Sequence, residues 1–216
     1  MTADTHFLGD LAFEYLVSDG QSTAVGQAVV TVEPDLSRPN TWIGTSSSEA
    51  ITGTSADDYL FGFDSDDTLN GDDGNDTLVG GTGNDTLEGG KGDDHYIFGA
   101  GDGVDTIVNA SSGKPGNDSL HLNGDLNPDN LWFTQLGNDL VIDVVGTNDQ
   151  ITARDWYSDS SAQIDAIYAD DQVLYANQVD QLVAAMASFD VPTGVGAIVP
   201  QDTRDQVAPV IASSWS

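Results

Sequence analysis

A large apolar residue recurs at every ninth position through the middle of the chain, between residues 53 and 97. Read in register, five consecutive nonapeptides each begin with glycine and carry aspartate at the sixth place and an apolar residue at the eighth. A fixed period without insertions indicates a repeat architecture, in which each unit buries its apolar face against its neighbours. The apolar residues are Leu60, Leu69, Leu78, Leu87 and Tyr96, and the aspartates are Asp58, Asp67, Asp76, Asp85 and Asp94.

Each nonapeptide has the composition of a short turn followed by a short strand. Glycine at the first, second and fourth places allows the positive-φ conformations and close backbone approaches that other residues resist. Two nonapeptides complete one flattened coil, and the eighth-place side chains then point inward between two parallel sheets. The pattern therefore predicts a parallel β-roll.

The sixth-place aspartates create a repulsion that a divalent cation would relieve. In such a coil each aspartate lies about one strand spacing, roughly 5 Å, from the aspartate two repeats later. Two carboxylates this close repel by about 3 kcal/mol at an effective dielectric near 20. Calcium accepts several carboxylate and carbonyl oxygens, whereas magnesium keeps its waters in a tighter octahedron. The spacing predicts Ca²⁺ ions between Asp58 and Asp76, between Asp67 and Asp85, and between Asp76 and Asp94.

The repeats GGTGNDTLE from Gly80 and GGKGDDHYI from Gly89 resemble the repeats-in-toxin (RTX) calcium-binding motif GGxGxDxUx. The resemblance implies three to five Ca²⁺ ions, bound by the sixth-place side chains and by carbonyl oxygens of the loop glycines. The implied metal-binding residues are Asp58, Asp67, Asp76, Asp85, Asp94, Asp72, Gly71, Gly74, Gly80, Gly81, Gly83, Gly89, Gly90, Gly92 and Asp118.

Two positions in this set of sites stay open. A pair between Glu49 and Asp67 is weakened because the repeat GTSSSEAIT has lost the aspartate and most of the loop glycines. Asp118 belongs to a further nonapeptide, GKPGNDSLH, whose separation from Asp94 is not a multiple of the period. Asp118 therefore follows an insertion in the roll.

The segments before and after the repeats predict additional β-structure. Residues 1–40 read as two strands and a linker, and FEYLVSDGQSTAVGQAVVTVEP resembles the last strands of Ig-like or cadherin-like modules of bacterial adhesins. A hairpin docked on the roll is the alternative. After the roll at 41–125, residues 126–189 contain alternating strand patterns and an apolar helical stripe after the expected N-cap Asn177. They resemble the haemolysin-related domain that caps the roll.

The expected fold is thus all-β: a parallel β-roll (an RTX β-solenoid) followed by a small β-rich capping domain with one C-terminal helix. Residues 190–216 resemble the uncleaved export signal of type I secretion substrates. Their deletion is expected to abolish export and to leave calcium-induced folding largely intact.

Composition restricts the function further. The chain has 5 Lys and Arg against 36 Asp and Glu, a formal charge of −31, so binding to nucleic acid phosphates is excluded. It has no Cys, and bound calcium would replace disulfide staples. No apolar run reaches the length of a membrane span, and no classical signal peptide is present. No HExxH or GxSxG motif occurs, so no enzyme is expected.

Together these features predict a calcium-dependent folding and export module of a type I secreted RTX adhesin. It would be monomeric, would interact with calcium and the type I secretion machinery, and would be secreted or held on the surface of a Gram-negative bacterium. An RTX tail of a toxin or hydrolase is the first alternative. The second is a solenoid whose recurring threonines bind an ordered surface such as ice: Thr68, Thr77, Thr86 and Thr106.

Overall fold

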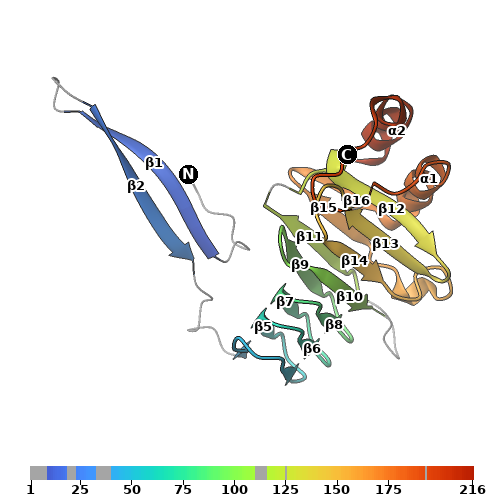
Figure 1. Ribbon diagram of the computed structural model, residues 1–216. Helices are drawn as coiled ribbons and strands as arrows, with labels where there is room; N and C mark the ends of the chain where they lie inside the picture. The colour runs from blue at the N-terminus through green and yellow to red at the C-terminus, as the bar shows by residue number, and fades with distance from the viewer. Residues whose placement is uncertain (1–8, 19–22, 33–39, 110–115, 125, 193) are drawn as a thin grey trace. The chain divides into compact units, whose positions relative to one another are not determined.

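The computed structural model describes residues 9–18, 23–32, 40–109, 116–124, 126–192 and 194–216 (Figure 1). The chain forms two compact units, residues 1–39 and 40–216. In the first unit, strands β1 (Gly9–Ser18) and β2 (Thr23–Val32) pair antiparallel along their whole length. The two strands expected before the linker are therefore present, whereas Asp19 and Gly20 of the expected turn lie outside the described residues.

The nonapeptides of the second unit alternate between two parallel sheets (Figure 1). The eighth-place residues stack in register, so that Leu60 lies beside Leu78 and Leu78 beside Tyr96, while Leu69 lies beside Leu87 in the facing sheet. One sheet contains β3 (Thr41–Ile43), β5 (Tyr59–Asp64), β7 (Thr77–Thr82), β9 (His95–Gly99) and β11 (Ser119–Asn123), and the other contains β4 (Ala50–Thr52), β6 (Thr68–Asn70), β8 (Thr86–Glu88) and β10 (Val104–Val108).

The inward ladder makes the core of the roll. Leu60, Leu69, Leu78 and Tyr96 are fully buried and Leu87 is 1% exposed. Burying a large apolar side chain contributes about 1.5–3 kcal/mol relative to leaving it in water. The apolar residue at every ninth position therefore places the two sheets face to face, and the predicted fold class is confirmed.

The C-terminal half continues the same two sheets. Strand β14 (Gln150–Ala153) pairs parallel with β10, and β15 (Ala166–Ala169) pairs parallel with β11, so each sheet is extended by one parallel strand. The strands that follow in each sheet pair antiparallel. The segments expected at 41–125, 126–189 and 190–216 thus lie in one unit. The added elements are η1 (Pro128–Asn130), β12 (Leu131–Leu136), β13 (Asp139–Val144), β14 (Gln150–Ala153), η2 (Ser160–Ala162), β15 (Ala166–Ala169), β16 (Gln172–Tyr175), α1 (Ala176–Met186) and α2 (Gln201–Ser214).

Helix α1 is the expected C-terminal helix, and it begins earlier than expected. Its N-cap is Tyr175 rather than Asn177, and the Gln178 side chain accepts the Tyr175 backbone N–H at 3.2 Å. The apolar stripe buries Val179 and Met186 in the core, as the spacing predicted.

Helix α2 is an addition to the expected fold, because it forms within the stretch that resembles an export signal. Its residues Val207 and Ile211 are buried, and so is Trp215 just after it. The final residue, Ser216, exchanges two backbone hydrogen bonds with Val173 on β16, at 3.0 and 3.1 Å. The end of the chain is therefore part of the folded core. Neither this helix nor any other in the described ranges is long and apolar enough to cross a membrane.

Candidate metal centre

The sixth-place aspartates form a buried ladder of two columns, with Asp58, Asp76 and Asp94 in one and Asp67 and Asp85 in the other. The Asp58 backbone N–H donates to Asp76 Oδ1 at 2.8 Å, that of Asp67 to Asp85 Oδ1 at 2.7 Å, and that of Asp76 to Asp94 Oδ1 at 2.9 Å. All five side chains are at most 2% exposed. The structure therefore brings together the three pairs that the period predicts.

The ladder extends over both positions that the sequence left open. Asp67 Oδ1 accepts the Glu49 N–H at 2.7 Å, so the degenerate first repeat keeps its place in the stack. Asp118 Oδ1 accepts the Asp94 N–H at 2.9 Å, across 24 residues instead of 18. The register of the stack is kept across this longer separation, with Ser119 paired to His95.

Two further aspartates, the buried Asp105 and the exposed Asp165, continue these columns and did not follow from the period. Asp105 Oδ1 accepts the Asp85 N–H at 3.0 Å, and Asp165 Oδ2 accepts the Asp118 N–H at 2.9 Å. Each of the two comes two residues before a buried isoleucine, Ile107 or Ile167, as in the regular repeats. This local Asp-x-apolar pattern was the signal that could have identified them.

The inner rungs leave carboxylate oxygens without any donor. Within the described part of the chain, Oδ2 has no hydrogen-bond partner in Asp67, Asp76, Asp85 and Asp105. A buried charge without a partner costs several kcal/mol, and a bound cation removes that cost. These four oxygens are therefore the strongest structural sign of metal ligation.

Backbone carbonyls converge on the same places. At Gly62, the space that a Cβ would fill is bordered by Asp67 Oδ2 and the Gly80 carbonyl oxygen. At Gly71 it is bordered by Asp76 Oδ2 and the carbonyl oxygen of Gly89. Only glycine leaves this space open, and the oxygens around it are the hard ligands that calcium prefers.

Any ion bound in the roll would take much of its coordination from carbonyl oxygens. No group of three or more His, Asp or Glu side chains capable of holding an ion is found among the described residues. The arrangement fits calcium, because this ion accepts carbonyl oxygens readily in flexible geometries.

The remaining predicted loop residues line the turns. Five of the glycines have positive φ, and a Cβ at Gly92 would strike the carbonyl oxygen of Gly74. Asp72 also has positive φ, at 76°, but its side chain is exposed and stands apart from the buried ladder. Its carbonyl oxygen lies against Gly90, so any contribution of Asp72 to a site would come from its backbone. The glycines with positive φ are Gly74, Gly81, Gly83, Gly90 and Gly92.

The two ends of the ladder differ from its middle. Asp58 Oδ2 accepts the Thr54 hydroxyl at 3.0 Å, and Asp58 Oδ1 accepts the indole N–H of Trp42 at 3.2 Å. Near the other end, one place before Asp165, Asp118 Oδ2 accepts the Asn109 amide at 2.9 Å. Protein donors therefore reach Oδ2 of Asp58 and of Asp118, whereas Oδ2 of Asp67, Asp76, Asp85 and Asp105 has no donor among the described residues.

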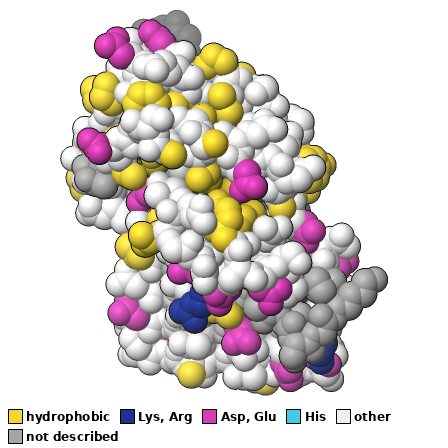
Figure 2. All heavy atoms as spheres, turned by 90° about the vertical axis from the view of Figure 1, so that its right-hand side faces the viewer, with side chains coloured by type: hydrophobic (Ala, Val, Ile, Leu, Met, Phe, Trp, Pro, Cys, Tyr) yellow, Lys and Arg dark blue, Asp and Glu magenta, His cyan; other side chains and the backbone are white. Residues whose placement is uncertain are grey.

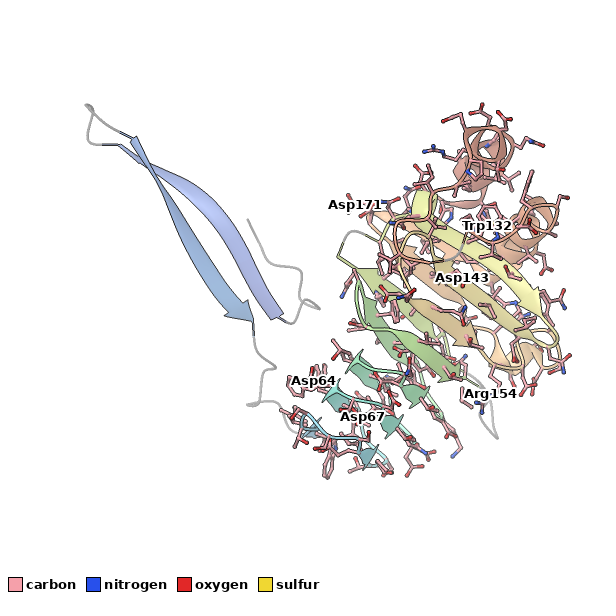
Figure 3. All side chains as sticks on the ribbon, viewed as in Figure 1. Asp64, Asp67, Trp132, Asp143, Arg154 and Asp171 are labelled. Atoms are coloured by element: carbon pink, nitrogen blue, oxygen red, sulfur yellow. The ribbon has the colours of Figure 1, made fainter. Side chains whose placement is uncertain are left out.

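The buried ladder contrasts with the acidic surface around it. Asp64 and Asp67, both labelled in Figure 3, lie on the same turn, yet Asp64 is exposed and Asp67 is buried. On the face shown in Figure 2, acidic side chains are scattered and basic ones are few. The negative field of a chain with a formal charge of −31 attracts cations toward the roll.

Burial controls the protonation of the ladder without metal. Loss of solvation raises the pKa of Asp76 to about 7, with the charges of Asp94 and Asp58 raising it further. Loss of solvation, together with the charges of their own neighbouring carboxylates, raises the pKa of Asp85 to about 6 and that of Asp105 to about 8. Hydrogen bonds from the backbone lower these pKa values but do not offset the loss of water. The metal-free coil therefore holds protons that an unfolded chain has released.

We expect the calcium affinity to increase as the pH rises from about 6 to about 8. In this window the raised pKa values mean that Ca²⁺ must displace protons from Asp85, Asp76 and Asp105 in turn. The stability of the metal-free fold should change with pH in the opposite direction. Its buried aspartates hold protons, so it loses stability as the pH rises through their folded-state pKa values. Calorimetry in two buffers of different ionisation enthalpy measures the released protons. An affinity that stays constant across this window would contradict the expectation.

Comparison with known proteins assigns the repeat segment. Residues 43–78 and 70–105 match the family model described as RTX calcium-binding nonapeptide repeat (4 copies). The chain is also similar to the solution structure of the AlgE6R3 subunit from the Azotobacter vinelandii mannuronan C5-epimerase, at 20% identity and a TM-score of 0.43. That match covers 73% of this chain and 91% of the other, and its TM-score is too low to support an inference. Residues 43–105 are therefore RTX calcium-binding nonapeptide repeats, and they form the β-roll of this chain.

Proposed function

We propose that this chain is the calcium-dependent folding and export module at the C-terminus of a type I secreted RTX adhesin. It stays unfolded in the cytosol and folds in extracellular calcium. The observation that carries the proposal is the set of buried carboxylate oxygens without donors on Asp67, Asp76, Asp85 and Asp105. In their ionised form these buried carboxylates repel one another, and divalent cations would offset that repulsion.

The size of the calcium contribution supports a switch. Extracellular calcium sites have dissociation constants of roughly 10⁻⁴ to 10⁻³ M, so cytosolic calcium would leave them empty. A tenfold excess over the dissociation constant contributes about 1.4 kcal/mol per site. Three to five ions would contribute about 4–7 kcal/mol, which approaches the stability of a whole domain.

Several features favour an exported, non-catalytic module. The self-repulsion of a formal charge of −31 opposes folding until cations bind. The likeness of residues 190–216 to type I export signals favours that route out of a Gram-negative cell, and the likeness of the first strands to Ig-like modules favours an adhesin. We assign no catalytic role to the roll. Added strands cover the β10 and β11 edges, which favours a monomer. A catalytic or toxin domain encoded upstream would instead favour the alternative parent.

A surface-binding face has weaker support. Thr68, Thr86 and Thr106 stand in register on one sheet, and Thr152 continues the row. Thr77, however, lies on the opposite sheet. A single column of threonines lacks the second matching column that a regular surface lattice would contact, so we do not propose this function.

We expect the chelated protein to lack a β-rich circular dichroism signal and to gain it on titration with calcium. The physical reason is that, without a cation, the ladder carboxylates can be buried only by taking up protons, which costs free energy near neutral pH. Magnesium at the same concentration is the control, and it should induce much less structure because it retains its own waters. A full β-rich signal in chelator would rule out the switch.

A further inference from the structure

Two of the three histidines converge on one serine on the outer face of a roll sheet. His95 Nδ1 lies 2.6 Å from Ser119 Oγ, and His121 Nε2 lies 3.1 Å from the same oxygen. His95 on β9 is the direct register partner of Ser119 on β11. His121 follows two residues later on β11 and therefore projects from the same face.

The spacing of the two imidazole rings is close to that of two imidazoles bound to one metal ion. Their centroids lie 5.6 Å apart, with the ring planes inclined by 58°. A zinc–nitrogen bond is about 2.0–2.1 Å long, so two imidazoles on one tetrahedral ion have centroids roughly 5 Å apart. Small rotations of the side chains would bring both nitrogens onto an ion beside the Ser119 hydroxyl.

Neighbouring groups hold this arrangement in place and keep it reachable. The ring of Tyr168 on β15 stacks on His121 at 4.7 Å between centroids, with the planes 11° from parallel. Both histidines are only partly buried, so an ion can approach from solvent. The strong negative charge of the chain raises the local concentration of cations.

This cluster is separate from the calcium ladder. Successive residues of a strand point to opposite faces, so Asp94 points into the roll and His95 points out of it. The chemistry also differs, because imidazole nitrogen suits zinc, copper and nickel, whereas calcium takes oxygen ligands. The two sites therefore select different ions.

We propose that His95, His121 and Ser119 form a second metal site that binds Zn²⁺ or a related transition-metal ion. The two imidazoles supply the principal ligands, the serine hydroxyl lies beside them, and water completes the coordination. The site joins β9 to β11, between which the nine-residue period is interrupted. Through Tyr168 it also contacts β15, the first strand of the C-terminal half in this sheet. A bound ion would therefore cross-link β9 and β11 next to the start of the C-terminal half.

Titration of tag-free, calcium-saturated protein with zinc in a calorimeter tests the proposal. We expect one zinc-binding event, a rise in the melting temperature and shifts of the His95 and His121 imidazole signals in NMR spectra. His121→Phe keeps a ring to stack on Tyr168 but removes the ligand nitrogen, and it should abolish that binding event. His95→Gln provides an independent variant with the same expected loss. His6→Gln, which changes the remaining histidine, is the matched control and should bind zinc like the parent.

Zinc binding that persists unchanged in His121→Phe and His95→Gln would overturn the proposal, because acidic side chains would then be the ligands. Absence of zinc binding in the parent would overturn it equally. The calcium-induced circular dichroism signal of each variant shows whether the roll has folded. A variant that folds with calcium and binds no zinc therefore supports the second site whether or not the export proposal holds.

Discussion

Replacing Asp76 with alanine should destabilise the calcium-loaded protein by about 4–6 kcal/mol. Asp76 stands in two pairs, with Asp58 and with Asp94, so its loss removes a ligand from two sites at about 1.4 kcal/mol each in tenfold excess calcium. It also leaves the buried Asp58 N–H without an acceptor, which costs about 1–3 kcal/mol. Urea unfolding monitored by circular dichroism at fixed calcium measures the change.

Asp58→Ala is the matched control, since both side chains are fully buried at the same place of the repeat. Asp58 stands in one predicted pair, and Thr54 and Trp42 already donate to its carboxylate. The dependence of the unfolding free energy on the logarithm of calcium concentration counts the linked ions. That slope should fall by about two ions for Asp76→Ala and by at most about one for Asp58→Ala. Equal slopes in the two variants would show that the ions are not shared between rungs.

Asp76→Asn keeps the oxygen that accepts the Asp58 N–H and removes only the charge. It should be more stable than Asp76→Ala in high calcium, and it should still lose calcium-linked stability. A variant with the full calcium slope of the parent would place the ions away from Asp76.

The regular part of the roll could be predicted because the sequence period and the structural period coincide. Nine residues separate Leu69 from Leu78, and no insertion disturbs the stack, so the inward ladder and the three aspartate pairs follow by counting. The resemblance to RTX repeats then indicated calcium. Neither step needed information on distant parts of the chain.

Counting residues does not predict the aspartate pairs where the chain contains an insertion but the strands keep their register. Asp85 and Asp105 are 20 residues apart, and Asp118 and Asp165 are 47 apart. Their pairing is set by hydrogen bonds between β8 and β10 and between β11 and β15. A repeat period records only local spacing, so these rungs become visible only when the strands are paired.

Helix α2 could not be read from local sequence for a different reason. It has Pro209 inside it, and proline in a helix interior strongly disfavours the helix. Most helical stability in proteins comes from packing an apolar face, and here Val207 and Ile211 provide that face. The sequence showed the likeness to an export signal but not the surface against which the helix packs.

Deleting residues 201–216 should therefore impair calcium-induced folding, contrary to the expectation from sequence alone. The deletion removes Val207, Ile211 and Trp215 from the core, each contributing about 1.5–3 kcal/mol by burial. It also exposes the edge of β16 at Val173, which pairs with Ser216. The truncated protein should unfold at lower urea concentration in saturating calcium. Export cannot then be separated from folding by this deletion.

A single substitution at Trp215 makes the sharper test of the folded tail. Trp215 is 5% exposed and meets Phe133 edge to face, with the ring centroids 6.5 Å apart. Trp215→Ala should cost about 3–5 kcal/mol of unfolding free energy in saturating calcium, as truncation of a buried aromatic does. Trp215→Phe is the control: the indole N–H finds no acceptor among the described residues, so a ring without it should cost less than about 1.5 kcal/mol. Urea titration of both variants decides the matter, because a Trp215→Ala protein as stable as the parent would mean that the tail does not pack on the core.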